Sequence, residues 1–85
     1  MLAYSTFQTL SAAEQQAYVK TWGIFMVTRP VGSFIVDLYF LEAGYYCEVW
    51  RQLPSTSVAF LRPFTEQAGL YPYLALINLP QDMLA

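Results

Sequence analysis

Two runs of β-branched and aromatic residues, separated by a short turn with a glycine, constrain the fold of this chain more than any other feature. The runs are Phe34–Leu41 and Tyr45–Trp50, and Ala43–Gly44 lies between them. Such residues favour strands, and a short turn with glycine between two such runs is typical of an antiparallel hairpin. We therefore expect this hairpin to form the centre of the fold.

The length of the turn decides which side chains of the hairpin share a face. With a two-residue turn, Tyr39 faces Glu48, Asp37 faces Trp50 and Leu41 faces Tyr46, all on one face. This outer face is too polar for a core and too apolar for a freely solvated surface, so we expect a partner to cover it. A slip of one residue would bury both carboxylates, which costs several kcal/mol if they lack partners. The opposite face is then the core, with Val36, Leu38, Phe40, Cys47 and Val49.

The rest of the chain predicts a single α+β domain over residues 1–85, in the order α-β-β-β-β-α. Residues 11–14 form a capping box, which predicts a first helix at about Ala12–Trp22 that ends at Gly23. Met1–Leu10 is an ordered lead-in or a frayed end. The other predicted elements are strands at Ile24–Arg29, Ser33–Glu42, Tyr45–Gln52 and Ser57–Phe64, a second helix at Leu70–Ile77, and a last helical turn within Leu79–Ala85.

Two prolines indicate the order of the strands. Pro30 and Pro63 fall near the ends of the first and fourth strands. Proline cannot donate to a sheet ladder, so it is found at sheet edges. We therefore expect a four-stranded antiparallel meander with these two strands at its edges. Both helices are expected to pack on the core face of the sheet, which also includes Leu61 of the fourth strand.

Composition favours a covered surface and excludes several partners. Apolar residues make up 56% of the chain and charged residues only 12%. In so small a domain some apolar groups must lie outside, which favours self-association or a protein partner. The net charge of −2 and the scattered cations argue against nucleic acid and against an anionic membrane surface. No apolar run approaches the ~20 residues of a membrane span.

The residue types that carry most catalysis and metal binding are scarce. The chain has no histidine and one cysteine, so we expect no metal site and no cofactor. Cys47 falls at an inward strand position and is expected to be a buried, inert thiol. Without a disulfide framework or a recognisable signal peptide, the expected compartment is the cytoplasm.

Several segments together resemble a family of short, uncharacterised bacterial proteins. They are the motifs "VDLYFLEAGYYCEVW", "LRPF" and "LYPYLALINL", which follow a helix, Gly23, Phe25 and Arg29. The resemblance spans roughly Glu14 to Leu79. The chain departs from the family pattern in a shorter, less acidic loop at Leu53–Thr56 and at Pro63. The resemblance supports the order of elements and implies no activity.

Three arrangements of side chains are candidates for chemistry. Glu48 and Arg62 are expected to face each other, either as a cross-strand salt bridge, which we favour, or as an anion contact built from Arg62. Asp37 and Glu48 could divide acid and base roles or bind a metal, but solvated sheet charges are the favoured interpretation. The aromatic residues fit a protein interface, cross-strand stacking or a small-molecule pocket.

We therefore expect a non-enzymatic interaction module, most simply a homo-oligomer that associates through the outer face of the sheet. The alternative is a module that holds a small apolar or aromatic ligand between sheet and helix, and an enzyme is the third choice. The candidate interface residues are Phe25, Asp37, Tyr39, Tyr46, Glu48, Trp50, Phe60 and Arg62.

Overall fold

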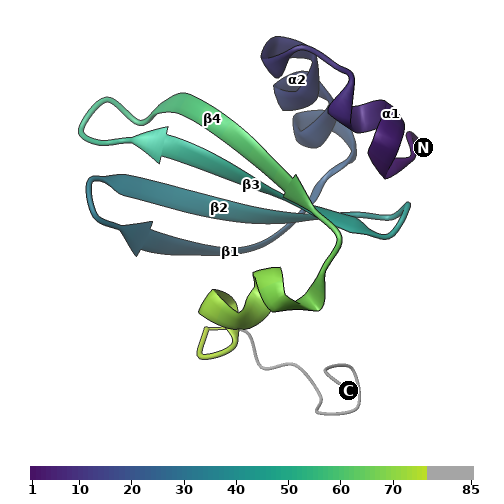
Figure 1. The fold of residues 1–85 in the computed structure, drawn as a ribbon. Coiled ribbons are helices and arrows are strands. Elements are labelled where there is room, and N and C mark those ends of the chain that lie inside the picture. Colours follow the sequence, from purple (N-terminus) through teal and green to yellow (C-terminus); the bar gives the residue numbers. More distant parts are fainter. Residues whose placement is uncertain (77–85) are drawn as a thin grey trace.

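The fold is a four-stranded antiparallel meander with helical segments before and after it (Figure 1). The computed structural model describes residues 1–76, so the end of the second predicted helix and the predicted turn within Leu79–Ala85 lie outside the described residues. The sheet order is β1-β2-β3-β4. The predicted α+β class and strand order are therefore confirmed. The strands are β1 (Ile24–Val31), β2 (Phe34–Leu41), β3 (Tyr45–Gln52) and β4 (Ser57–Phe64).

The helix predicted from the capping box is present with the predicted bounds. It is α2 (Ala12–Trp22), and Ser11 is its N-cap. The Ser11 hydroxyl accepts from the Glu14 amide at 3.2 Å, and the Ser11 amide donates to the Glu14 carboxylate at 2.9 Å. These two bonds satisfy donors that the helix itself leaves unpaired. The expected lead-in Met1–Leu10 contains a further short helix, α1 (Tyr4–Gln8).

The β2–β3 turn has three residues, so the predicted two-residue turn is wrong. Leu41 pairs with Tyr45, and the pairing continues in register to Phe34 and Gln52. A two-residue type I′ turn would need positive φ at both Ala43 and Gly44. In the structure only Gly44 of these two has positive φ, at 103°. The longer turn shifts the register by one residue, which moves one strand's side chains to the other face.

Because of this shift, each face of the sheet has its own apolar core and its own helical cover. On the first face, here the α2 face, Phe7 of α1 and Val19 of α2 pack over Leu41, Tyr45, Cys47 and Val49. On the opposite face, here the η1 face, Leu70 and Tyr73 pack over Val36, Leu38 and Phe64. The prediction that both helices share one face, over a single core set, is therefore wrong. The helices lie on opposite sides of the sheet in Figure 1.

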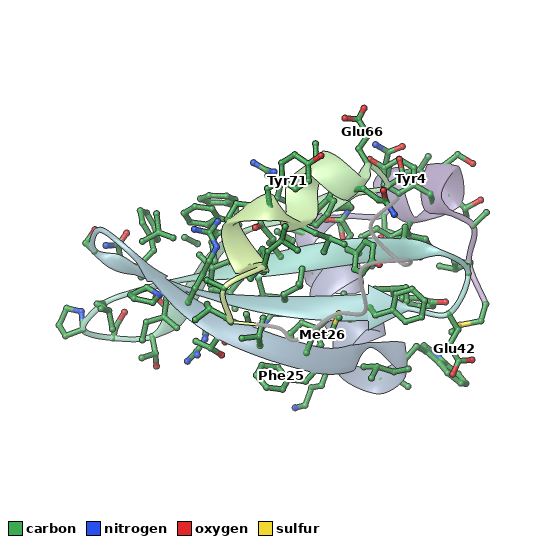
Figure 2. The ribbon with its side chains drawn as sticks, turned by 90° about the horizontal axis from the view of Figure 1, so that it is seen from below. Tyr4, Phe25, Met26, Glu42, Glu66 and Tyr71 are labelled. Atoms are coloured by element: carbon green, nitrogen blue, oxygen red, sulfur yellow. The ribbon has the colours of Figure 1, made fainter. Side chains whose placement is uncertain are left out.

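The second helical segment is a 3-10 helix, η1 (Gln67–Tyr73), rather than an α-helix at Leu70–Ile77. It contains Pro72, which has no N–H to donate to a helical hydrogen bond. Leu70 and Tyr73 are buried, whereas Tyr71 of η1 is 65% exposed (Figure 2). Their spacing of three residues, close to the period of a 3-10 helix, places the two buried side chains on one side of η1.

Candidate functional site

The centre of the η1 face is occupied by Glu48, whose side chain is only 1% exposed. Four donors surround its carboxylate. Arg62 and the Trp50 indole N–H contact Oε1 at 3.2 and 3.1 Å. Arg29 contacts Oε2 at 3.4 Å, and the Tyr73 hydroxyl donates a short hydrogen bond to the same oxygen. Three of these contacts are hydrogen bonds and the fourth, from Arg62, is an ion pair, so both oxygens of Glu48 have partners.

Four elements bring these donors together. Trp50 lies two residues beyond Glu48 on β3, so the two side chains share a face. Arg62 is directly across on β4, as predicted, and the expected salt bridge is confirmed. Arg29 extends from β1, whereas Tyr73 reaches the carboxylate from η1. This cluster, here the Glu48 cluster, therefore ties η1 to three strands of the sheet.

Arg29 is held by ring contacts as well as by charge. Its guanidinium carbon lies 4.7 Å from the centre of the Tyr73 ring and 6.0 Å from that of Trp50. Both distances are within the range of cation–π attraction. Burial lowers the pKa of Arg29, but the Tyr73 hydroxyl and the Glu48 carboxylate outweigh it and leave the pKa raised. Burial, then the hydrogen bond to Glu48, raises the pKa of Tyr73. The raised pKa values keep the Arg29 guanidinium charged and the Tyr73 hydroxyl neutral at neutral pH.

A second buried carboxylate lies on the α2 face. This carboxylate belongs to Asp37. Arg51 donates two hydrogen bonds to it, from Nε to Oδ2 at 2.8 Å and from Nη2 to Oδ1 at 3.1 Å. The Thr28 hydroxyl adds a bond to Oδ1 at 2.6 Å. Such two-pronged Arg–carboxylate pairs are among the strongest charge-assisted hydrogen bonds. The two carboxylates are on opposite faces of the sheet and are both buried, so they are neither an acid–base pair nor solvated charges.

The predicted interface residues do not share one face. Asp37 and Tyr39 belong to the α2 face, together with Phe25, which pairs with Tyr39. The other five lie on the η1 face, because the register differs by one residue from the prediction. They are Tyr46, Glu48, Trp50, Phe60 and Arg62.

Exposure also separates the candidates. Phe25 is 55% exposed on β1, an edge strand of the sheet (Figure 2). Trp22 and Ile24, close by in sequence, are also exposed. Its ring makes an edge contact with Tyr39, with ring centres 5.7 Å apart. Tyr46 is only partly exposed and stacks on Phe64 at 5.4 Å. Whether any of these residues contacts a partner stays a prediction.

Three aromatic rings gather where the sheet extends beyond its helices. Trp50 stacks on Phe60 with ring centres 5.0 Å apart, and Phe34 makes edge contacts with both, at 5.4 and 6.1 Å. We call this group the distal aromatic patch. It lies on the η1 face, and Figure 1 shows the strand ends near the β1–β2 and β3–β4 turns extending past α1, α2 and η1.

Sequence reasoning missed Phe34 as a member of this patch. Phe34 shares a face with Trp50 only when the β2–β3 turn has three residues. Phe60 joins them because a bulge shifts the β3–β4 register: Trp50 pairs with Phe60, but Arg51 pairs with Val58. Positive φ, which Gly44 tolerates and Ala43 disfavours, was the available signal for the longer turn.

Cys47 is buried, as predicted. Burial raises the pKa of its thiol to about 12, so the reactive thiolate is scarce at neutral pH. Within residues 1–76 there is no group of three or more acidic or cysteine side chains arranged to hold a metal ion. In the same range, no helix has the length and apolar character needed to cross a lipid bilayer.

Comparison of the chain with protein-family models, with curated proteins and with solved structures gave no match. The resemblance to short bacterial proteins therefore stays a prediction. The candidate surfaces rest on the geometry of the described residues alone.

Proposed function

We propose that this chain is a non-enzymatic interaction module that pairs with a second copy of itself through the distal aromatic patch. The observation that carries the proposal is the exposure of Phe60, 44%, in a group of three contacting rings at the end of the sheet that extends past the helices of the described residues. Aromatic side chains on rigid strands are typical anchors of protein interfaces.

A second copy is the favoured occupant because the patch is uncharged. Phe34, Trp50 and Phe60 carry no charge, so two patches can face each other without the repulsion that like charges would create. A twofold axis needs only one such self-complementary surface. The small size of the domain, 85 residues, adds a reason, since oligomers supplement the limited core of small domains.

The other candidate side chains of the η1 face are committed to the fold. Glu48 is surrounded by its four donors, and Arg62 directs its Nε to that carboxylate. Trp50 also donates to Glu48. A Trp50→Ala variant would therefore weaken the Glu48 cluster together with any interface. The Phe60 side chain stacks on Trp50 and meets the edge of Phe34, and it takes no part in the Glu48 cluster. A change at Phe60 therefore tests association with little effect on that cluster.

The test is sedimentation equilibrium of wild type, Phe60→Asp and Phe25→Asp over a wide range of micromolar concentrations. We expect the wild type to exceed its monomer mass of 9.7 kDa, and Phe60→Asp to be a monomer because paired patches would bring two like charges together. Phe25→Asp adds the same charge at another exposed ring, outside the patch, so it should associate like the wild type. Far-UV circular dichroism confirms that each variant is folded.

The proposal fails if the wild type sediments as a monomer throughout. It also fails if Phe60→Asp associates as strongly as the wild type, because the interface would then lie elsewhere. Loss of association in Phe25→Asp alone would place the contact at the β1 edge instead.

A further inference from the structure

A cavity of about 290 Å³ lies between α2 and the sheet, on the face opposite the distal aromatic patch. Val19 of α2, Val49 of β3 and Val58 of β4 form its apolar wall. Its volume is near the lower end of ligand cavities, which are roughly 300–1,000 Å³. The space therefore suits a compact molecule with a short apolar body.

Polar side chains around this cavity provide hydrogen-bond donors that no other group within residues 1–76 uses; Gln16 and Lys20 are exposed and Tyr39 is half-buried. Gln16 and Lys20 are four residues apart on α2, so they project from the same side of the helix. Among the described residues, neither side chain forms a hydrogen bond or ion pair, and the same holds for the hydroxyl of Tyr39, which also lines the cavity. Three donor groups around one cavity favour a ligand that accepts hydrogen bonds.

The charges at the cavity also favour an anion. Asp37 is the carboxylate of the lining, and its two oxygens already accept bonds from Arg51 and Thr28. Arg51 uses Nε and Nη2 on Asp37, which leaves further N–H groups of its guanidinium. Because Lys20 and Arg51 are cationic, the lining has one positive charge in excess of Asp37.

We propose that this cavity binds a small organic monoanion, a carboxylate on a short apolar or aromatic body. The carboxylate lies between Lys20 and Arg51, and the body packs on the valine wall. One excess positive charge matches a monocarboxylate better than a doubly charged phosphate ester. The site does not depend on the proposed self-association, because the distal aromatic patch is on the other face of the sheet.

Benzoate is the probe, with benzamide as its uncharged analogue and phenyl phosphate as the dianion. Each is titrated into the full chain to millimolar concentration, and amide resonances are followed by NMR. Lys20→Gln removes a cation at the cavity, and Arg62→Gln is the matched control because it removes the same charge on the η1 face. Sedimentation of the same samples reports association separately.

We expect benzoate to shift the amide resonances of Val19, Val49 and Val58 and to bind more tightly than benzamide. Lys20→Gln should weaken benzoate binding about tenfold, the loss of one charge-assisted hydrogen bond. Arg62→Gln should bind benzoate like the wild type.

Four results would overturn the proposal. They are no benzoate shift at the cavity, equal affinity for benzamide, tighter binding of phenyl phosphate than of benzoate, and equal losses in Lys20→Gln and Arg62→Gln.

Discussion

Removal of the negative charge of Glu48 should destabilise the fold more than any other single change in its cluster. Glu48→Gln keeps the shape of the side chain but places an amide N–H₂ against groups that themselves donate. Arg29 would remain largely buried beside it without a counter-charge. Breaking a buried ion pair by removing one partner costs about 3–5 kcal/mol.

The cost in stability of removing each partner of Glu48 depends on how buried that partner is and on the bond it makes. The Arg62 side chain is 57% exposed, so Arg62→Ala should cost no more than about 1 kcal/mol. Tyr73→Phe removes one donor to a charged acceptor and should cost about 1.5–3 kcal/mol. The expected order of destabilisation is therefore Glu48→Gln, then Tyr73→Phe, then Arg62→Ala.

Urea denaturation of the wild type and the three variants measures these differences. A domain of 85 residues has a total stability of about 4–13 kcal/mol, so Glu48→Gln removes a large share of it. If that variant is unfolded in buffer, Tyr73→Phe still tests the cluster. A Glu48→Gln variant within 1 kcal/mol of wild type would refute the reasoning, because the carboxylate would then contribute little beyond its shape. So would an Arg62→Ala loss of several kcal/mol.

Two further predictions concern residues outside the Glu48 cluster. Gly69→Ala should destabilise the chain by about 1–3 kcal/mol, because a Cβ at this position would lie 2.3 Å from the buried ring of Phe64. Urea melts measure this loss, and an unchanged midpoint of unfolding would mean that the ring moves aside at no cost. Burial raises the pKa of the Cys47 thiol from its ordinary value of 9.0 to about 12 in the fold. The unfolded chain therefore loses this proton at lower pH than the folded chain. The stability that the shift contributes is fully present below pH 9 and is lost as the pH rises toward 12. Urea melts between pH 7 and 10.5 should show a steeper alkaline loss for wild type than for Cys47→Ala, and equal slopes would contradict the shift.

Local signals were sufficient for the elements that local chemistry controls. The capping box at Ser11 predicts α2, because both of its hydrogen bonds lie within four residues of sequence. Runs of strand-forming residues predict the four strands. Pro30 and Pro63 predict the edges, since each lacks an N–H for a second neighbouring strand. The α+β meander could therefore be derived from the sequence.

The register of the hairpin could not be derived in the same way. Both faces of β2 carry large apolar side chains, so the alternation of residues does not identify a single inward face. The choice depends on whether Ala43 adopts positive φ, which is a small local energy difference. The structure instead has three residues in the turn, and this one residue redistributes every predicted interface side chain between two faces.

The argument against burying Asp37 and Glu48 assumed that they would lack partners. Asp37 meets Arg51 across the hairpin, whereas Glu48 meets Arg29, Arg62 and Tyr73 from β1, β4 and η1. These partners are up to 25 residues away in sequence and come together only when the sheet and η1 assemble. The sequence by itself determined the elements and their order. The tertiary structure decided which charges are buried, because only there do their partners supply the hydrogen bonds that offset desolvation.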